Sequence, residues 1–345
     1  MLTFIYSIEL FTVPLFIGAP AKIDTLPVLI YRDFFVWFPP NYGRVVTSST
    51  ILLAITIAGM YFYYKTIAHE RRFATITGKG FQVGLIKLGK WRNITSALLI
   101  IIVLVVVILP LSVVILSSFV PAWTGSISIL TLENYFKIFS REMYTGAIIN
   151  SFLLSVLSAT ILICIGLFIS YIILRTSIVW RKILDYTAML PAVVPGIVFG
   201  YGLLLAWVVH IPLGITGTLA IMLLALTTRN LPFSVRTLST GFLQIDRELE
   251  EAATTNGSSY FKTFFKITLP LLRTHIIFTF FLLYTIILRD LGSVLFVTTG
   301  KTMVVPVLMI FTWTEGDWVS TSTMAVILIC LMAIGVYMIE KFGKK

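Results

Sequence analysis

The sequence predicts an all-α integral membrane protein, because of its composition and the length of its apolar runs. Of its 345 residues, 58% are hydrophobic and only 12% are charged, and the mean hydropathy is +0.99. Several apolar runs exceed the ~20 residues that a helix needs to cross ~30 Å of hydrocarbon. A membrane β-barrel needs short segments of alternating polarity, which the sequence does not have. The spans are therefore expected to be helices, which satisfy their own backbone polar groups.

Eight apolar runs are expected to form the membrane-spanning helices. They cover residues 2–17, 45–64, 94–118, 147–174, 183–209, 216–235, 274–297 and 321–340. If the segment 65–93 is cytoplasmic, alternation places 175–182, 236–273 and the C-terminus on the same side of the membrane.

Most of the basic residues fall on that side of the predicted membrane. They are Lys65, Arg71, Arg72, Lys79, Lys87, Lys90, Arg92, Arg175, Arg181, Lys182, Arg236, Arg247, Lys262, Lys266, Arg273, Lys341, Lys344 and Lys345. The opposite side has only Lys22, Arg32, Arg44, Lys137, Arg141 and Lys301. The positive-inside rule then predicts a multi-pass protein of the cell membrane with a cytoplasmic C-terminus. This topology accounts for the net charge of +11 without a nucleic-acid partner.

The two ends of the chain contain similar segments. VPLFIGAPAKIDTLPVLIY (13–31) and SVLFVTTGKTMVVPVLMIF (293–311) share Leu-Phe, a Lys and Pro-Val-Leu at nearly constant offset. Either this is coincidence among apolar segments, or residues 1–64 are the tail of an incomplete unit whose complete copy occupies 94–345. On the second interpretation, 65–93 is a basic cytoplasmic linker, and the chain is a fragment or one polypeptide of a split pair.

No motif for catalysis is visible. The segment TTGKT (298–302) is similar to a phosphate-binding loop, but that motif requires a glycine where Leu295 stands. No nucleophile with a base and no carboxylate pair in a soluble cleft can be found. The two cysteines and three histidines are scattered without metal-ligand spacing. The chain is therefore not expected to be an enzyme or to hold a metal or cofactor, and its energy source must be a partner.

One polar stretch, EEAATTNGSSYFKTFFKITLP (250–270), lies between the predicted spans. Asp246 is expected to be the N-cap of a short helix over 247–256 that Gly257 ends. Ala252 and Ala253 give this helix little side-chain bulk, so a groove of another protein can approach its backbone closely.

A second short helix is expected after this one. Its aromatic residues are predicted to face the bundle, with the lysines pointing away from them. The aromatic residues are Tyr260, Phe261, Phe264 and Phe265, and the lysines are Lys262 and Lys266. Pro270 is expected where the next span begins, since its missing N–H costs little there.

The spacing of the polar stretch resembles the EAA loop of ABC-transporter importer permeases. The matching residues are Glu251, Ala252, Ala253, Gly257, Ile267, Leu269 and Pro270. The loop (239–273) also falls between the fourth and fifth spans of the 94–345 unit, where that family has it. An amphipathic cytoplasmic linker is the alternative.

Other segments also resemble this family. MLPAVVPGIVFGYG (189–202) and NSFLLSVLSAT (150–160) are similar to its third span and to the opening of its second. TGKGFQVGLIKLGKW (77–91) and LRDLGSVLFV (288–297) are most similar to fused permeases of the ferric-iron and thiamine type. A fused permease has two EAA loops, and this chain has one, which puts in doubt whether it transports alone.

The resemblance implies a type I ABC importer permease bundle of six transmembrane helices, preceded by about two helices of an incomplete repeat. The EAA loop would dock on a cytoplasmic ATPase dimer, which binds ATP and Mg. A second permease half or a homologous chain would complete the pathway, and an external binding protein would deliver cargo to loops such as 119–146 and 298–320. Ferric iron is the expected cargo, with thiamine, polyamine, phosphonate and sulfate as alternatives. An ATP-independent secondary transporter or channel would lack a reason for the docking loop. A nonfunctional remnant of a larger permease is a third alternative, because the front of the first unit is missing; an upstream reading frame that encodes the missing spans and a second EAA loop would argue against it.

Intramembrane polar residues are the candidates for the translocation pathway. Arg289 and Asp290 lie within the predicted span 274–297, where charge is costly unless it faces the bundle interior, a partner or water. The repeat places Glu9 opposite Arg289. These residues either line a pathway or form an interhelical ion pair. Pro195 and Gly196 interrupt another span, for gating or, as we favour, for close packing.

Overall fold

The computed structural model describes residues 7–70, 89, 91–122, 129–210 and 214–343, and every regular element in this part of the chain is helical. The chain divides into two units. The first contains residues 1–60, 142–308 and 328–345, and the second contains 61–141 and 309–327. The predicted linker 65–93 and the segment 77–91 lie mostly outside the described residues.

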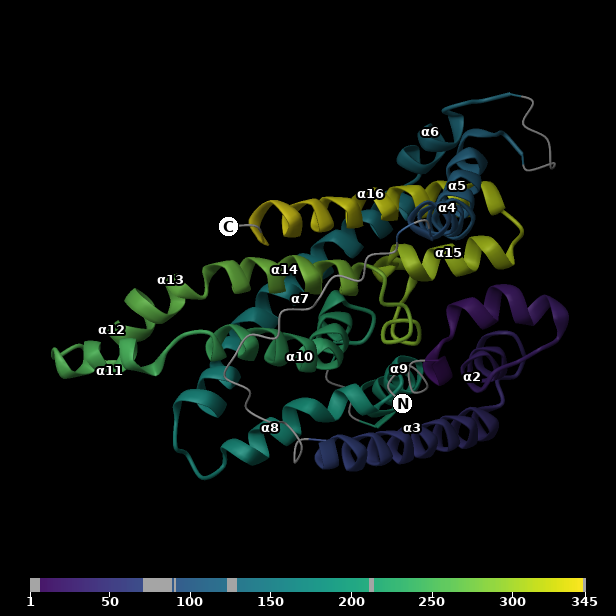
Figure 1. Cartoon of the computed structure of the whole chain (residues 1–345). Coiled ribbons are helices and arrows are strands. Elements are labelled where there is room, and N and C mark those ends of the chain that lie inside the picture. Colours follow the sequence, from purple (N-terminus) through teal and green to yellow (C-terminus); the bar gives the residue numbers. More distant parts are fainter. Residues whose placement is uncertain (1–6, 71–88, 90, 123–128, 211–213, 344–345) are drawn as a thin grey trace. The chain divides into compact units, whose positions relative to one another are not determined.

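Figure 1 shows the α-helices in chain order. They are α2 (Leu26–Phe35), α3 (Tyr42–Glu70), α4 (Trp91–Val103), α5 (Leu109–Phe119), α6 (Glu133–Ser140), α7 (Glu142–Arg175), α8 (Arg181–Met189), α9 (Gly196–Leu203), α10 (Leu219–Leu243), α11 (Arg247–Thr255), α12 (Tyr260–Thr263), α13 (Leu269–Leu271), α14 (Arg273–Leu288), α15 (Val305–Thr314) and α16 (Trp318–Gly343).

Four helices in the described residues are long and apolar enough to cross a membrane, or six if each of two bent pairs counts as one span. The four straight candidates are Tyr42–Phe62, Trp91–Phe119, Glu142–Arg175 and Trp318–Phe342. They confirm the predicted helices at 45–64, 94–118, 147–174 and 321–340, and the all-α fold class with them.

Three predicted spans differ from the structure, because hydropathy cannot show where an apolar run stops being helical. The described part of 2–17 is broken at Leu10 and Phe11. The run 183–209 is two pieces, Arg181–Val193 and Gly196–Trp207, bent by 100°. The third, 274–297, ends as a helix at Leu288 and continues as turns. The predicted span 216–235, the fourth of the 94–345 unit, corresponds to the helix α10. By length and hydropathy together, α10 is not among the candidate spans.

The core of the first unit lies where α7, α10 and α14 pack together. Leu162, Leu238 and Leu283 are fully buried there. Polar side chains also join the helices: the Ser234 hydroxyl donates to the Leu162 carbonyl at 2.6 Å, and the Ser170 hydroxyl to the Val235 carbonyl at 3.0 Å. Small hydroxyl residues of this kind are typical of helix contacts inside membranes.

The second parts of the two similar sequence segments have the same order of elements, although Pro14–Gly18 is a π-helix and the corresponding residues before Gly300 form turns. A 3-10 turn, Ala19–Ala21, precedes α2, and another, Gly300–Thr302, precedes α15. Both helices begin one residue before the proline of Pro-Val-Leu, at Leu26 and Val305. The repeat itself stays a prediction, and TTGKT forms a turn rather than the start of a phosphate-binding helix.

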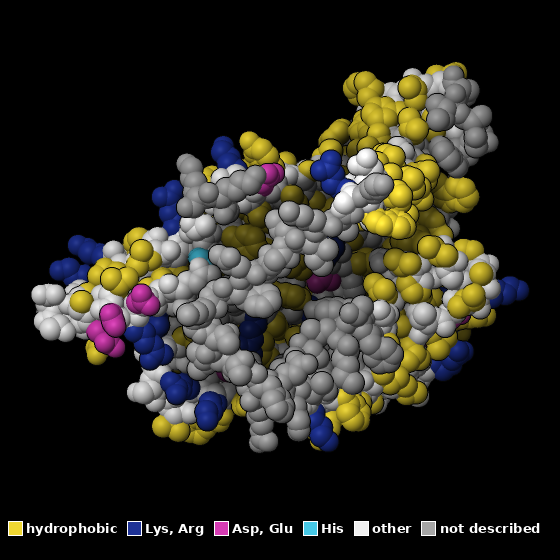
Figure 2. Space-filling view, viewed as in Figure 1, with side chains coloured by type: hydrophobic (Ala, Val, Ile, Leu, Met, Phe, Trp, Pro, Cys, Tyr) yellow, Lys and Arg dark blue, Asp and Glu magenta, His cyan; other side chains and the backbone are white. Residues whose placement is uncertain are grey.

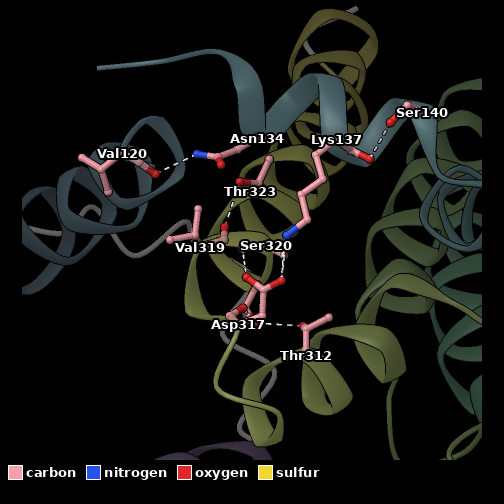
Figure 3. Close-up of polar contacts among 10 residues, drawn as sticks. Val120, Asn134, Lys137, Ser140, Thr312, Asp317, Val319, Ser320 and Thr323 are labelled. Atoms are coloured by element: carbon pink, nitrogen blue, oxygen red, sulfur yellow. Dashed lines mark hydrogen bonds and ion pairs between the residues drawn. The ribbon is translucent and has the colours of Figure 1, made fainter. Parts of the chain in front are cut away.

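In the second unit an ion pair joins α6 to the start of α16. The Lys137 ammonium donates to Asp317 Oδ2 at 3.0 Å, and Asp317 also accepts from the backbone N–H and the hydroxyl of Ser320 (Figure 3). Burial raises the pKa of Asp317, but the hydrogen bonds from Ser320 and Lys137 outweigh it and leave the pKa below its ordinary value. Asp317 is thus the charged N-cap of α16.

The helices α4 and α5 of the second unit are apolar on all sides for most of their length. No residue of α4 is buried, and its side chains from Leu98 to Val103 are between 46% and 61% exposed. The hydrophobic surface over these helices is visible in Figure 2. An all-round apolar helix is stable only in lipid or against another apolar surface.

Candidate functional site

The first candidate site is the α11 segment, which follows the buried end of α10. As predicted, α11 begins after Asp246, whose backbone is extended, although the Asp246 side chain makes no capping hydrogen bond. Glu251 and Ala252 are exposed and Ala253 is half-buried. The segment therefore presents the Glu251 carboxylate beside two small side chains, and Glu248 is exposed on the same helix. Acidic and basic side chains gather over this end of the first unit in Figure 2.

Gly257 ends α11, as the sequence predicts. Its φ of +81° lies in the left-handed region, which a residue with a Cβ adopts only at a cost. The Gly257 N–H donates to the Thr254 carbonyl and the Ser258 N–H donates to the Ala253 carbonyl, both at 3.0 Å. These two bonds form a Schellman motif, which satisfies the last carbonyls of the helix.

A buried cation holds α11 against the rest of the first unit. Arg175, the last residue of α7, donates from Nη2 to the Phe242 and Ile245 carbonyls at 3.0 and 2.7 Å. Its Nε lies 3.3 Å from Glu250 Oε1, and the two side chains are only 6% and 14% exposed. The Thr268 hydroxyl donates to the same Glu250 oxygen at 3.0 Å. We call this group the Arg175 clamp, since it ties together α7, the end of α10, α11 and the π-helical segment Phe264–Thr268.

The segment after Gly257 corrects one prediction. Three of its four aromatic residues do not face the bundle: Tyr260, Phe261 and Phe265 are 78%, 75% and 49% exposed. Phe264 is half-buried and packs on Tyr171 of α7. Thr263 and Thr268 also point inward, and are 4% and 0% exposed. The period of a helix shows which side chains share a face, but not which face the bundle covers.

The remaining residues of the predicted loop lie where the chain turns into the next span. Lys262 and Lys266 are exposed, as expected, while Ile267 and Leu269 are half-buried. Pro270 lies in the first turn of α13, and the piece Tyr260–Leu271 meets Arg273–Leu288 at 68°. Pro270 therefore lies at the end of the piece before the bend, just ahead of the span that begins at Arg273.

The second candidate site is a polar cavity of about 280 Å³ in the first unit. Glu9, Arg229, Arg289 and Asp290 supply its charged groups, and Gly196 and Gly292 supply part of its wall. Four of the five predicted pathway residues thus come together around one cavity. The fifth, Pro195, is buried as the N-cap of α9 and is not among the lining residues.

Within this cavity Glu9 forms an ion pair with Arg229 of α10, which the sequence did not single out as a partner. Glu9 Oε2 and Arg229 Nη2 are 3.0 Å apart, and the side chains are 11% and 15% exposed. Arg229 also donates to the Pro191 carbonyl at 2.6 Å. Asp290 accepts from the N–H and hydroxyl of Ser293 at 3.2 and 3.0 Å. Arg289 and Asp290 lie at the end of α14 and in the turn after it, not inside a helical span.

A close backbone contact shapes the wall of the cavity. A Cβ on Gly200 would lie 2.6 Å from the Gly292 carbonyl oxygen, and a Cβ on Gly292 would lie 2.9 Å from the Ile197 backbone nitrogen. The interruption around Gly196 therefore serves close packing, as favoured from the sequence.

Sequence reasoning missed three side chains that hold these sites together: Arg175, Glu250 and Arg229. For Arg229 a signal existed, since it stands inside the apolar run 216–235 where a charge needs a partner. No local pattern shows that Arg175 and Glu250 meet, because they are far apart in the sequence. Among the described residues, no group of three or more His, Cys, Asp or Glu side chains is arranged to hold a metal ion.

The bundle of apolar helices with an exposed EAA segment is that of a membrane permease. The chain belongs to the family of binding-protein-dependent transport system inner membrane components, whose family model matches residues 162–342.

Among characterised relatives, the chain is 26% identical over 338 residues to the ferric transport system permease protein FbpB of Actinobacillus pleuropneumoniae, a match that covers 97% of this chain and 48% of the relative. It is 27% identical over 307 residues to the putative ferric transport system permease protein FbpB 1 of Haemophilus influenzae, covering 88% and 48%. A putative 2-aminoethylphosphonate transport system permease protein, PhnV of Salmonella paratyphi A, is 22% identical over 237 residues, covering 69% and 89%. The chain spans about half the length of the two ferric relatives.

The fold is shared with a solved transporter. A chain of the bacterial ABC transporter involved in the import of the acidic polysaccharide alginate superposes with a TM-score of 0.59 at 16% identity, covering 74% of this chain and 97% of that one. The same transporter in complex with an alginate pentasaccharide-bound periplasmic protein gives a TM-score of 0.56 at 16% identity, covering 73% and 95%. The type I ABC importer permease fold expected from the sequence is therefore confirmed.

Proposed function

We propose that the protein is a permease subunit of an ATP-binding-cassette importer, and that it contains no ATPase itself. The observation that carries this proposal is α11: an exposed helix with Glu251, Ala252 and Ala253 on its surface, ended by Gly257 and held by a buried clamp. A helix that only linked two spans would need neither a bare surface nor a rigid attachment. Membership of the family supports the same function.

The Arg175 clamp suggests how ATP binding by a partner moves the spans. An ATPase dimer that closes around α11 displaces Glu250, and through it the guanidinium that holds the ends of α7 and α10. The 68° bend before α14 lets the segment Tyr260–Leu271 follow α11. The coupling segment and the core helices thus move together, which is the requirement for alternating access.

We further propose that the polar cavity is this chain's part of the translocation pathway. It contains charged groups that a membrane core tolerates only in contact with partners or water. The repeated element order around α2 and α15 supports residues 1–64 as the tail of one permease unit and 94–345 as a second. Because one coupling helix is present among the 345 residues and an ATPase dimer has two docking grooves, a second permease unit is expected to complete the transporter. An external binding protein would deliver the cargo.

Ferric iron is the cargo that we propose. Two relatives that the chain matches along most of its length are ferric transport permeases. A phosphonate permease matches over a shorter part of this chain, and sulfate, thiamine and polyamine remain the alternatives to be tested. The cytoplasmic position of the C-terminus is also part of this proposal and can be checked with a C-terminal reporter fusion.

The decisive experiment is purification of the protein with the ATPase, the second permease unit and the binding protein encoded beside it, followed by uptake of radioactive ferric iron into vesicles loaded with ATP. Replacing Glu251 with Ala is expected to weaken ATPase binding and ATP-driven uptake, while Glu248→Gln, on the same exposed helix, leaves both unchanged. Uptake that proceeds without ATP, or an ATPase that binds the Glu251→Ala variant equally well, would show a channel or secondary transporter instead. Uptake of another solute with normal ATPase docking would overturn only the cargo.

A further inference from the structure

An exposed aromatic pocket lies beside the coupling segment, and the function proposed above makes no use of it. Six rings line a cavity of about 460 Å³, and they belong to Phe168, Tyr171, Tyr260, Phe261, Phe264 and Phe265. The rings from 260–265 pack on one another and on α7: the Phe261 and Phe265 centroids are 4.6 Å apart, and the Tyr171 and Phe264 centroids are 5.2 Å apart. The rings therefore contact one another around a single cavity and are not scattered over the surface.

The position of the pocket along α7 shows which medium it faces. Arg175 ends α7 and contacts α11, so this end of the helix is the coupling end. At 1.5 Å per residue, Tyr171 lies ~6 Å and Phe168 ~10 Å from Arg175 toward the middle of the span. Phe168 is 68% exposed at that depth. The pocket therefore opens where headgroups give way to hydrocarbon, the level at which aromatic side chains gather in membrane proteins.

The segment 260–271 has the character of a helix that lies in the membrane interface. It leaves the axis of α14 by 68°. Lys262 and Lys266 are exposed and spaced four residues apart, so they form a basic row beside the row made by Phe261 and Phe265. An apolar row and a basic row on one short helix are the pattern of an interfacial amphipathic helix, which is attracted to anionic lipid.

We propose that this pocket binds an anionic phospholipid of the leaflet on the coupling side, with an acyl chain among the six rings and the phosphate near Lys262 and Lys266. A lipid fits better than a soluble protein, because two of the rings stand on α7 at a depth that a partner outside the headgroups does not reach. The two lysines supply the complementary charge. The proposal needs only that α7 spans the membrane, and it is independent of the cargo and of ATPase docking.

The test uses the full-length protein in nanodiscs of equal parts phosphatidylcholine and phosphatidylglycerol. Trace phosphatidylglycerol with a photoactivatable diazirine on its acyl chain is cross-linked, and the labelled peptides are mapped; a phosphatidylcholine probe with the same diazirine is run in parallel. Labelling of 260–265 and 168–171 is expected to favour phosphatidylglycerol. Each lysine contributes roughly fivefold to such a preference, so Lys262→Gln with Lys266→Gln should reduce it by about tenfold or more.

Two further variants separate this site from ordinary lipid contact. Phe168→Ser should lower labelling of 260–265, whereas Phe152→Ser, an exposed ring nearer the other end of α7, should not. Equal labelling by both probes, unchanged in the lysine variant, would overturn the proposal in favour of non-specific lipid. Loss of labelling on adding the ATPase, with Phe261 cross-linked to that ATPase, would overturn it in favour of a protein occupant.

Discussion

The Arg175 clamp makes a quantitative prediction about how tightly α11 is held. The guanidinium donates to two carbonyls at the end of α10 and faces the Glu250 carboxylate, and both side chains are largely buried. Replacing Arg175 with Gln removes these contacts and leaves an unpaired carboxylate. The double variant Arg175→Gln with Glu250→Gln removes the buried charge as well.

The expected changes in the free energy that holds α11 in place follow from the burial of Arg175 and Glu250. Breaking a buried ion pair by removing one partner costs ~3–5 kcal/mol, much of which is the penalty of the remaining charge. Glu250→Gln alone keeps an acceptor for Thr268 and exchanges a charged hydrogen bond for a neutral one, a loss of ~1–2 kcal/mol. Since ~1.4 kcal/mol corresponds to a tenfold change in an equilibrium constant, Arg175→Gln should increase the population of detached α11 by ~100-fold or more. The double variant should be less perturbed than Arg175→Gln alone.

Hydrogen exchange of the α11 amides measures this population, because exchange follows local opening. The wild type, Arg175→Gln, Glu250→Gln and the double variant are compared. Glu248→Gln is the control for losing an exposed carboxylate from the same helix, and the amides of α16 are an internal reference. The reasoning is refuted if α11 in Arg175→Gln exchanges within about threefold of the wild type. It is also refuted if the double variant is more perturbed than the single one, because a stranded charge would then not be the source of the effect.

Three further predictions concern single positions. Gly257→Ala must place a Cβ in the left-handed region, so it should destabilise the end of α11 by ~1–2 kcal/mol, and hydrogen exchange at 253–256 should rise accordingly. Gly200→Ala puts a methyl group against the Gly292 carbonyl and should lower the apparent melting temperature, with a cost of ~1–3 kcal/mol for overpacking. Because the pKa of Asp317 is lower in the folded protein, its charge stabilises the fold at every pH above the unfolded carboxyl value of ~3.9. That stabilisation is lost as the pH falls through the folded pKa, so the melting-temperature advantage over Asp317→Asn should be constant near neutrality and shrink below about pH 4.

Matched variants control each of these. Gly257→Asn should recover much of the loss, since asparagine tolerates the left-handed region, and failure to recover would point to side-chain size instead. Gly202→Ala, on the same helix as Gly200 with no atom within 4 Å of the added Cβ, should be harmless. Glu315→Gln, which removes an exposed carboxylate before the same helix as Asp317, should leave the melting temperature near neutrality close to that of the wild type; a loss equal to that of Asp317→Asn would contradict a specific role for the Lys137 ion pair.

The sequence predicts the helices of this protein better than it predicts where they bend. Long apolar runs and the Asp246 to Gly257 spacing depend on local preferences, and the helices they predict are present. The helix ending at Leu288 was not predicted, because LGSVLFV is as apolar as a span. Its turn is imposed by the contact between Gly292 and Gly196–Ile197, which is distant in sequence.

The two candidate sites show the same limit. The EAA residues were found because their spacing lies within one short segment. The Arg175–Glu250 and Glu9–Arg229 pairs join residues far apart in the chain, and no period or motif relates them. The aromatic side of 260–265 was recognised as one face, but its direction depends on the tertiary fold, which buries Thr263 and Thr268 instead.

The turn from Leu291 to Val297 has a consequence for biogenesis. Its side chains are almost entirely buried, and its backbone is not helical. The N–H groups of Val294, Leu295 and Val297 donate to carbonyls within the turn, but its backbone pairing is less complete than that of a helix, so the segment is poorly suited to enter the bilayer as an independent span. It has to insert together with the helix that follows the break at Gly196, whose backbone it touches. We therefore expect the translocation machinery to retain α14 until α9 is in place, which makes the assembly of this region a concerted step rather than a helix-by-helix one.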